Sequence, residues 1–285
     1  MQIIDGKKIA ADIIARLKAR PKPEGFFAAI LVGDDAASLH FLKQKEKVAR
    51  ELDIDFRLYT LPATTSTDAL RHEIGRLAGP TGCGACIVQL PLPEGINRHY
   101  VLNAIPKEKD LDILSEAALG AFYTGRHPIV PPSVGAVEEI LTLQDRALRE
   151  LKVVVIGAGF LIGKPIGFWL QNRVAELSVL DSRVTDLRSH LHGADVVVSG
   201  AGQANLFSPD DLKDGALVID FGWNPSTHSI NSGPAGPRVV GDFAVDREAE
   251  SYKLKAISYT PMPGGTGPIL VAKLFENFYI LNSSQ

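Results

Sequence analysis

A glycine-rich turn between an apolar run and a helical pattern is the clearest chemical feature of this sequence. Leu151 to Ile156 has the composition of a buried strand and leads into Gly157-Ala158-Gly159, with Ile162 and Gly163 opening a helix. Glycines at this spacing permit a tight turn and a close backbone approach, and the free N–H groups of a helix N-terminus attract a pyrophosphate. The segment predicts a dinucleotide site; the alternative is a packing turn without a ligand.

Three polar residues after the next predicted strand bear on which dinucleotide would bind. Asp181 stands where an acid commonly bonds the adenosine ribose 2′-hydroxyl, which favours NAD. Ser182 and Arg183 beside it could instead hold the 2′-phosphate of NADP. These residues leave the choice between the two cofactors open.

The two cysteines, Cys83 and Cys86, are spaced as C-x-x-C ahead of the apolar run Ile87 to Leu90. A redox pair would place its first thiolate at a helix N-terminus, and a structural zinc would need a second pair or two histidines. Because neither pattern occurs, we expect buried, unreactive strand residues and no metal site.

Length and composition indicate a soluble protein of two ordinary domains. The chain has 285 residues, of which 45% are hydrophobic and 22% charged, and no apolar run reaches the length of a membrane helix. A formal net charge of -3 gives no reason to expect nucleic acid as a partner. The start, Met1 to Gly6, has the pattern of neither a secretory signal nor a transit peptide. We therefore expect a cytoplasmic protein that binds a small molecule, without membrane contact.

The elements that would position these residues alternate between strand and helix from the start of the chain. Helical periodicity covers three segments, Lys7 to Arg20, Ala37 to Leu52 and Ser66 to Leu77. Apolar strand patterns cover Phe26 to Val32, Phe56 to Tyr59 and Ala85 to Leu90. This alternation predicts parallel βαβ units with helices on both faces, which is the α/β class.

A stretch rich in His, Pro and Val, Arg126 to Ser133, is the predicted linker to a second doubly wound domain. Helix and strand patterns then alternate over Val134 to Leu143, Lys152 to Ile156, Gly163 to Gln171, Glu176 to Leu180, Val184 to Leu191, Asp195 to Ser199 and Leu217 to Phe221. Thr227 to Arg238 has the composition of an exposed loop. Gly264 to Pro268 opens a last helix, Ile269 to Leu281.

Four segments together resemble the methylenetetrahydrofolate dehydrogenase/cyclohydrolase family, and the resemblance runs almost end to end. They are Gly33-Asp34-Asp35-Ala36-Ala37-Ser38, Val88-Gln89-Leu90-Pro91-Leu92-Pro93, Lys109-Asp110-Leu111-Asp112 and Thr260-Pro261-Met262-Pro263-Gly264-Gly265-Thr266-Gly267-Pro268. The second and fourth are highly specific to the family, and all four occur in the right order around the glycine turn.

The resemblance assigns roles to three polar residues in the first domain. By it, Lys45 is the central catalytic group, Gln89 is its hydrogen-bonding neighbour, and Asp112 holds the pterin ring of a folate. A lysine of lowered pKa can move a proton during addition of water, and a carboxylate can accept two donors from the pterin. Without the family register, Lys45 would be read as a solvated helix charge, Gln89 as a loop anchor, and Asp112 as the cap of a helix near Ser115.

The resemblance also names residues around the substrate, and here the chain departs from the family twice. Ser38, Phe41, Pro263, Gly264 and Gly265 are the expected substrate contacts. Phe41 stands where the family has tyrosine, which keeps an aromatic face but removes a hydroxyl. Ile113 stands where the family has glycine after the second aspartate, so we expect a local backbone that avoids any glycine-only conformation.

Other departures lie in the linker, the glycine turn and the last loop. The family has Pro-Cys-Thr-Pro where this chain has Pro131-Pro132-Ser133-Val134, and valine where it has Thr266. In the family's Gly-Arg-Ser turn, Ala158 replaces the arginine, which removes one usual contact to a 2′-phosphate. The expected cofactor is NADP or NAD, with a slight lean to NAD. The expected cofactor contacts are Gly157, Ala158, Gly159, Ile162, Gly163, Asp181, Ser182 and Arg183.

The resemblance implies a bifunctional enzyme of one-carbon metabolism that serves purine biosynthesis. It would oxidise 5,10-methylenetetrahydrofolate with NAD(P)+ and hydrolyse the methenyl product to 10-formyltetrahydrofolate. The alternatives are a dehydrogenase that has lost the hydrolysis through Phe41, or a catalytically silent folate- or nucleotide-binding relative. The implied fold is a folate-site α/β domain, 1–130 with 268–285, and a Rossmann-like domain, 131–267, with the C-terminal helix returning to the first domain. A homodimer is expected.

Overall fold

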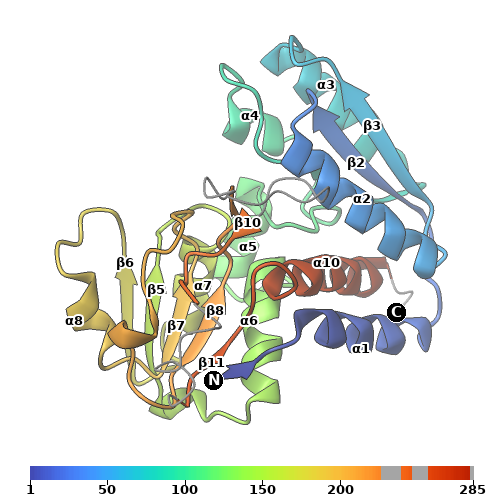
Figure 1. Ribbon diagram of the computed structural model, residues 1–285. Coiled ribbons are helices and arrows are strands. Elements are labelled where there is room, and N and C mark those ends of the chain that lie inside the picture. The colour runs from blue at the N-terminus through green and yellow to red at the C-terminus, as the bar shows by residue number, and fades with distance from the viewer. Residues whose placement is uncertain (226–238, 246–255, 283–285) are drawn as a thin grey trace, which may run out of the picture. The chain divides into compact units, whose positions relative to one another are not determined.

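A computed structural model describes residues 1–225, 239–245 and 256–282, and it divides into two compact units (Figure 1). The folate-side unit comprises Ala10–Pro132 and the chain from Val271 onward. The nucleotide-side unit comprises Met1–Ile9 and Ser133–Leu270. The loop predicted over Thr227 to Arg238 lies outside the described residues.

The folate-side unit is built on a parallel three-stranded sheet in the order β3-β2-β4. Its elements are α1 (Gly6–Lys18), β2 (Phe26–Val32), α2 (Ala36–Glu51), β3 (Phe56–Leu61), α3 (Thr67–Ala78), β4 (Cys83–Val88), α4 (Arg98–Leu102) and α5 (Glu116–Tyr123). Strands β2 and β4 are apolar and buried almost throughout, as expected for parallel strands covered on both faces. The predicted α/β class is confirmed, although α4 was not predicted from the sequence and only the start of α5, near Ser115, was.

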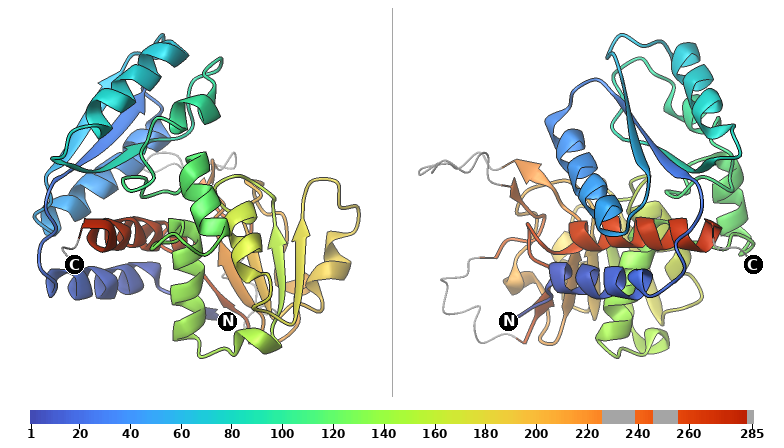
Figure 2. Two further views of the ribbon diagram at one scale, coloured as in Figure 1. Left: turned by 180° about the vertical axis from the view of Figure 1, so that it is seen from behind. Right: turned by 90° about the vertical axis from the view of Figure 1, so that its right-hand side faces the viewer.

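The C-terminal helix α10 (Thr266–Asn282) enters the folate-side unit, as predicted. Phe275 and Phe278 are fully buried and pack against Phe27 of β2, with ring centroids 5.6 and 5.7 Å apart. Helix α1 runs beside α10 in every view (Figure 2), and Arg16 approaches Glu276 to 3.9 Å. The last helix therefore supplies part of the core beneath the first sheet.

The nucleotide-side unit holds a parallel six-stranded sheet in the order β1-β11-β8-β7-β5-β6. Its elements are β1 (Gln2–Ile3), α6 (Pro132–Leu143), η1 (Leu148–Glu150), β5 (Lys152–Ile156), α7 (Gly163–Leu170), β6 (Glu176–Leu180), α8 (Leu187–Leu191), β7 (Val196–Ser199), η2 (Pro209–Asp211), β8 (Leu217–Asp220), β9 (Asn224–Pro225), β10 (Val239–Val240) and β11 (Ser258–Tyr259). The chain moves from β5 outward to β6 and then returns to β7 on the other side. The point between β5 and β7 is thus the topological switch point, where doubly wound sheets bind ligands.

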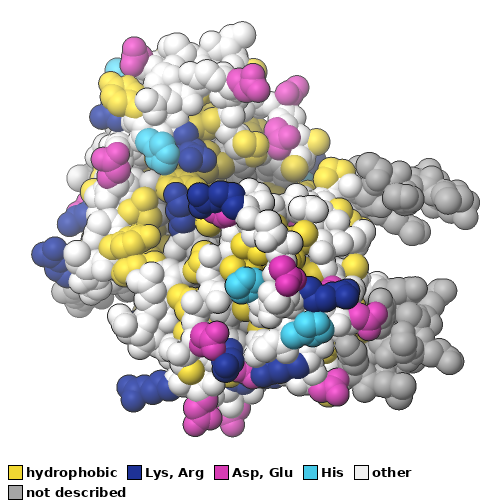
Figure 3. All heavy atoms as spheres, turned by 90° about the vertical axis from the view of Figure 1, so that its left-hand side faces the viewer, with side chains coloured by type: hydrophobic (Ala, Val, Ile, Leu, Met, Phe, Trp, Pro, Cys, Tyr) yellow, Lys and Arg dark blue, Asp and Glu magenta, His cyan; other side chains and the backbone are white. Residues whose placement is uncertain are grey.

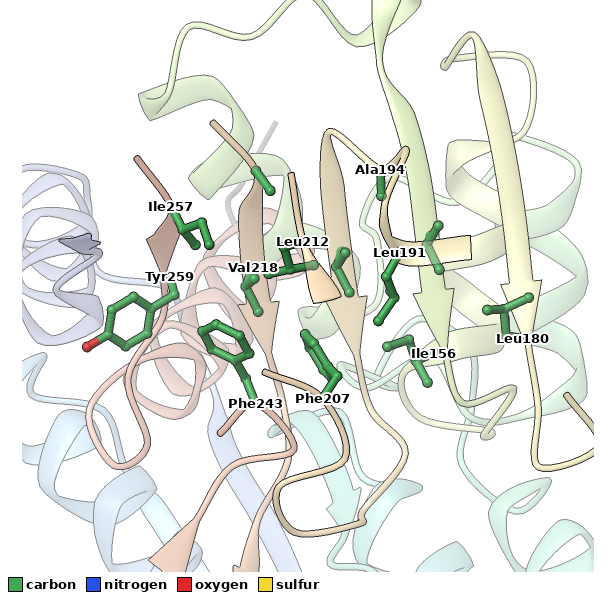
Figure 4. Packing of buried hydrophobic residues seen from close by; sticks show 13 residues of the cluster. Ile156, Leu180, Leu191, Ala194, Phe207, Leu212, Val218, Phe243, Ile257 and Tyr259 are labelled. Carbon is green, nitrogen blue, oxygen red and sulfur yellow. The ribbon is translucent and has the colours of Figure 1, made fainter. Parts of the chain in front are cut away.

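One apolar cluster packs against this sheet (Figure 4). Phe243 lies between Phe207 and Tyr259, with ring centroids 5.1 and 5.8 Å away. Ile156 and Val218, from β5 and β8, belong to the same cluster. Val197 of β7 belongs to it too, and because β5 and β7 lead into the loops at the switch point, the cluster holds those loops on a rigid base.

The chain ends are divided between the units differently from the sequence-based domain bounds. The sequence placed residues 1–130 in the first domain, whereas β1 joins the nucleotide-side sheet because Gln2 and Ile3 pair with Ser258 and Tyr259 of β11. A strand of two residues carries too little periodicity to be recognised from sequence.

Candidate active site

Helix α2 carries the predicted catalytic lysine. Asp35 caps its N-terminus by accepting a hydrogen bond from the backbone N–H of Ser38, 2.8 Å away. Ser38, Phe41 and Lys45 are three and four residues apart, so they share one face of the helix. Ser38 is buried, while Phe41 and Lys45 are half-buried. The three residues that the family register selected are therefore brought together.

Gln89, directly after β4, holds the lysine. The Lys45 ammonium Nζ donates to Gln89 Oε1 over 3.0 Å, and Gln89 Nε2 donates to the backbone oxygen of Leu90 over 2.8 Å. Ser38 Oγ donates to the same Leu90 oxygen at 3.4 Å. The bond from Gln89 Nε2 to Leu90 fixes the orientation of the amide, so that its oxygen faces Lys45. A neutral acceptor can thus position the lysine without stabilising its charge as a carboxylate would.

Lys45 and Asp112 influence each other's charge. Burial lowers the pKa of Lys45, and the negative charge of Asp112 opposes that shift only in part. Burial likewise raises the pKa of Asp112, against the opposing field of Lys45. A lysine whose pKa is lowered has a larger neutral fraction near pH 7, and the neutral amine can accept a proton.

Asp112 lies in a turn that Asp110 organises. Asp110 is only 1% exposed, and its Oδ2 accepts the backbone N–H groups of Leu114 and Ser115 at 3.0 and 2.7 Å. Ser115 in turn caps α5. The alternative that Asp112 caps this helix is therefore wrong, and within the described part of the chain the Asp112 carboxylate accepts no hydrogen bond. It is available to a ligand.

The backbone at Ile113 contradicts our expectation. Its φ is 55°, in the left-handed region that favours glycine, although we expected the isoleucine to prevent such a conformation. The side chain is 1% exposed. Burial of this apolar side chain and the paired hydrogen bonds to Asp110 offset the cost of the conformation, which is about 1–2 kcal/mol. The turn that carries Asp112 keeps a glycine-like shape without glycine.

Asn277 of α10 also holds this turn, a role that no pattern in the sequence indicates. Its Nδ2 donates to the backbone oxygens of Leu111 and Val130, at 3.0 and 2.9 Å. The side chain is 4% exposed. Asn277 lies 166 residues after Leu111, so only the folded chain brings them together.

In the nucleotide-side unit the three glycines of the turn fill three different roles. Gly157 has φ of 92°, and a Cβ there would lie 2.6 Å from the oxygen of Gly200. A Cβ on Gly163 would lie 1.6 Å from the oxygen of Gly157, so α7 packs closely on the turn. A Cβ on Gly159 would meet nothing within 4 Å. The first and third glycines thus serve packing, and the second leaves open space, as a bound pyrophosphate requires.

Ile162 and Ala158, two further predicted cofactor contacts, also lie at this turn. Ile162 lies over Gly200, the first residue after β7, where a Cβ would come within 2.5 Å of the Ile162 side chain. Ala158 lies between the two glycines of the turn. The predicted cofactor contacts of this segment therefore meet at the switch point.

Asp181 and Arg183 form an ion pair directly after β6. The Arg183 guanidinium Nε donates to both carboxylate oxygens of Asp181, at 3.1 and 3.0 Å, and the backbone N–H of Arg183 donates to Oδ1 at 3.0 Å. These bonds lower the pKa of Asp181 to about 2. Ser182 between them is exposed. The Asp181 carboxylate is therefore fully ionised at neutral pH.

Pro263, Gly264 and Gly265 lie in the nucleotide-side unit, between β11 and α10. Gly264 has φ of 99°, and a Cβ on Gly6 would lie 1.7 Å from the Gly265 oxygen. Thr266 is buried, and its Oγ1 donates to the backbone oxygen of Asp220 at 2.8 Å, which gives a structural reason for a hydroxyl residue there. Contact of this loop with substrate stays a prediction.

The remaining predictions concern cysteines and surface. Cys83 and Cys86 are buried in β4, and burial raises the pKa of both thiols, as expected of unreactive strand residues. Among the described residues, no group of acids, histidines and cysteines has the arrangement of a metal site. Within the same residues, no helix has the length and apolar character needed to cross a membrane. On the face drawn in Figure 3, basic side chains are interspersed with acidic ones.

Two models of one protein family match this chain, one for each of its two parts. Residues 4–112 match the family model described as tetrahydrofolate dehydrogenase/cyclohydrolase, catalytic domain. Residues 131–285 match the NAD(P)-binding domain of the same family. The chain belongs to the tetrahydrofolate dehydrogenase/cyclohydrolase family.

Relatives and solved structures of this family match nearly the whole chain. The bifunctional protein FolD of Heliobacterium modesticaldum is 37% identical, covering 97% of this chain and 94% of its own. The methylenetetrahydrofolate dehydrogenase-cyclohydrolase of Trypanosoma brucei, solved with NADP and an inhibitor, has a TM-score of 0.88 and 31% identity, covering 98% of this chain and 96% of its own. The bifunctional FolD enzyme of Campylobacter jejuni has a TM-score of 0.87 and 30% identity over 98% and 97% of the two chains.

Proposed function

We propose that this protein oxidises 5,10-methylenetetrahydrofolate with NAD(P)+ and hydrolyses the 5,10-methenyl product to 10-formyltetrahydrofolate. The observation that carries the proposal is the half-buried Lys45, held by the neutral amide of Gln89 within the field of Asp112. Membership in the family indicates which reaction is catalysed, and Lys45 is a group that can act in it as a proton carrier. Folate is the small-molecule partner.

Folate binding falls to the groups around Lys45. Asp112 accepts donors from the 2-amino-4-oxopteridine, because its carboxylate has no hydrogen bond from the described residues. Phe41, one helical turn before Lys45, offers an aromatic face to a substrate ring. Lys45 shares the face of α2 with Phe41 and interacts electrostatically with Asp112, which makes it the group of this site that can act on the one-carbon bridge.

The hydrolysis proceeds through one proton carrier. A water oxygen bonds to the methenyl carbon while neutral Lys45 Nζ accepts one of its protons. The bond from this carbon to N5 then breaks, N5 takes the proton back from Lys45, and the second water proton leaves to solvent. The product carries the formyl group on N10. Gln89 keeps Lys45 oriented through both steps because its own amide is fixed by Leu90.

The oxidation uses the second unit. A bound dinucleotide would supply the hydride acceptor for this reaction. The backbone of Gly157 to Gly159 and the N-terminus of α7 would hold its pyrophosphate, for which Gly159 leaves space. The contribution of this unit is to bind and orient the dinucleotide.

NAD is the preferred cofactor within this proposal. Asp181 is ionised and would repel a 2′-phosphate, and Ala158 offers no charge to bind one. Initial rates with NAD and NADP give the ratio of kcat/KM values, and we expect a ratio above one. Asp181→Ser should lower the ratio by raising kcat/KM for NADP. Ser189→Ala, on α8 of the same unit, is the control; a parent that prefers NADP contradicts this part.

Assays of both activities test the proposal as a whole. We expect reduced dinucleotide to form from methylenetetrahydrofolate, and methenyltetrahydrofolate to be hydrolysed faster than in buffer. Lys45→Met should abolish hydrolysis, while Lys43→Met, on an exposed position of the same helix, should not. Oxidation without any hydrolysis would favour a dehydrogenase alone, and the absence of both would favour a silent relative.

A homodimer in the cytoplasm is part of the same proposal. Strand β6 is an edge of the nucleotide-side sheet, and Val179 on it is 43% exposed. An edge strand with exposed apolar residues can pair with a second copy. Light scattering should give the mass of a dimer, and Val179→Lys should give a monomer.

A further inference from the structure

Asp242 lies in the nucleotide-side unit, just after β10, and has no assigned role. Its side chain is fully buried, with 0% exposure. Oδ2 accepts hydrogen bonds from Ser199 Oγ at 2.7 Å and from the backbone N–H groups of Ala201 and Gly202 at 2.9 and 3.3 Å. Oδ1 accepts from the Gln203 backbone N–H at 2.9 Å and from Asn224 Nδ2 at 3.0 Å. One carboxylate thus receives five donors.

Three of these donors belong to the loop from Gly200 to Gln203 that follows β7. The oxygen of Gly200 lies against Gly157 of the dinucleotide turn, at the distance where a Cβ would clash. The loop therefore forms the other side of the switch point between β5 and β7. Its backbone shape depends on the carboxylate that gathers its N–H groups.

The backbone at Asp242 is itself held by hydrogen bonds to Asn205 and Leu206. The backbone oxygen of Asp242 accepts the N–H of Leu206 at 2.7 Å, and Asn205 donates to the oxygen of Gly241 at 3.2 Å. The next residue, Phe243, is anchored between Phe207 and Tyr259 in the apolar cluster (Figure 4). The carboxylate is thus held against the rigid core of the sheet, and it transmits that rigidity to the loop.

The donors require an acceptor-only group. All five partners offer N–H or O–H, so an ionised carboxylate satisfies them, whereas an asparagine would turn an NH₂ group toward some of them. Both carboxylate oxygens already accept hydrogen bonds from the protein and the side chain is fully buried, so Asp242 does not contact the cofactor itself. We propose that Asp242 is a positioning residue for the dinucleotide: it sets the loop from Gly200 to Gln203 against the glycine turn. This inference rests on the proposed function of the unit as the NAD(P) site.

The test separates cofactor binding from hydrolysis, because hydrolysis uses Lys45 in the other unit and consumes no dinucleotide. Titration of the full chain with NADH and NADPH gives the cofactor Kd, and methenyltetrahydrofolate hydrolysis is measured in parallel. Asp242→Asn should raise the cofactor Kd by about tenfold or more, as expected for disrupted bonds to a buried charge. The hydrolysis rate and the folate KM should stay within about twofold of the parent's.

Two further variants keep the inference testable if Asp242→Asn does not fold. Ser199→Ala removes one of the three hydrogen bonds to Oδ2 and should also raise the cofactor Kd, by a smaller factor. Asp214→Asn removes an equal charge from an exposed side chain of the same unit and should change nothing.

An unchanged cofactor Kd in folded Asp242→Asn or in Ser199→Ala overturns the inference while leaving the proposed function intact. An equal loss of cofactor binding and hydrolysis in both variants shows a merely structural role and also overturns it. A parent protein that binds neither dinucleotide overturns the proposed function, and that result precedes any variant.

Discussion

At the scale of single residues, the central feature of the site is Lys45, whose charged form is only partly stabilised by its surroundings. Gln89 meets Lys45 with a neutral oxygen at 3.0 Å, and burial lowers the lysine pKa. Gln89→Glu would put a carboxylate at the same distance and raise that pKa. Because the neutral amine is the base, we expect the pH–rate profile of hydrolysis to move to higher pH and the rate at pH 7 to fall. Gln44→Glu adds the same charge beside Lys45 without the bond; a profile that moves equally there would refute the direct effect.

Phe41 supplies the second prediction at this scale. It occupies the face of α2 that carries Lys45, one turn away, but lacks the hydroxyl of the family's tyrosine. Phe41→Tyr should accelerate methenyltetrahydrofolate hydrolysis by up to about tenfold, the value of one good hydrogen bond in the transition state. Single-turnover rates give the comparison, and Phe122→Tyr on α5 is the control. If the rate does not change, the hydroxyl has no part in this chain's mechanism.

At the scale of elements, the C-terminal helix matters through one amide. Asn277 of α10 donates to the backbone oxygen of Leu111, the residue before Asp112, and to that of Val130. Asn277→Ala should loosen the turn of Asp112 and raise the folate KM by about tenfold, since two buried acceptors lose their donor. The dinucleotide Kd should stay unchanged, because that site lies in the other unit. Ile280→Ala changes an exposed residue of the same helix as a control, and an unaltered folate KM in Asn277→Ala would remove the positioning role.

What the sequence could predict at this scale follows from how local each signal is. Strands such as β2 and β5 were predicted with their observed bounds, since an uninterrupted apolar run marks a buried parallel strand. The two-residue strands β1 and β11 have no such signal. Lys45, Gln89 and Asp112 were found only through family motifs. Asn277 and Asp242 were missed because their roles depend on contacts between distant segments, and the shape at Ile113 was predicted wrongly because the sequence does not report the bonds to Asp110 that enforce it.

At the scale of the whole molecule, each unit contains a buried carboxylate whose pKa is raised to about 6. Asp110 lies in the folate-side unit and Asp220 in the nucleotide-side unit, and burial raises the pKa of each to about 6. The unfolded chain releases these protons near pH 3.8, so between about pH 4 and 6 the folded state binds more protons than the unfolded state. The free energy of unfolding should therefore fall as pH rises through this range, by about 3 kcal/mol for each group.

Urea unfolding at a series of pH values between 4 and 7 would measure this loss, and the division into units sharpens the expectation. If the units unfold in separate transitions, Asp110→Asn should flatten the pH dependence of one transition and Asp220→Asn that of the other, because asparagine does not titrate. If they unfold together, the two variants should each remove a similar part of the loss. Asp214→Asn, which removes an exposed carboxylate, should leave the parent's pH dependence intact. A parent whose stability rises steadily from pH 4 to 6 would show that both carboxylates are already ionised in the folded state, and that the hydrogen bonds they accept outweigh the cost of their burial.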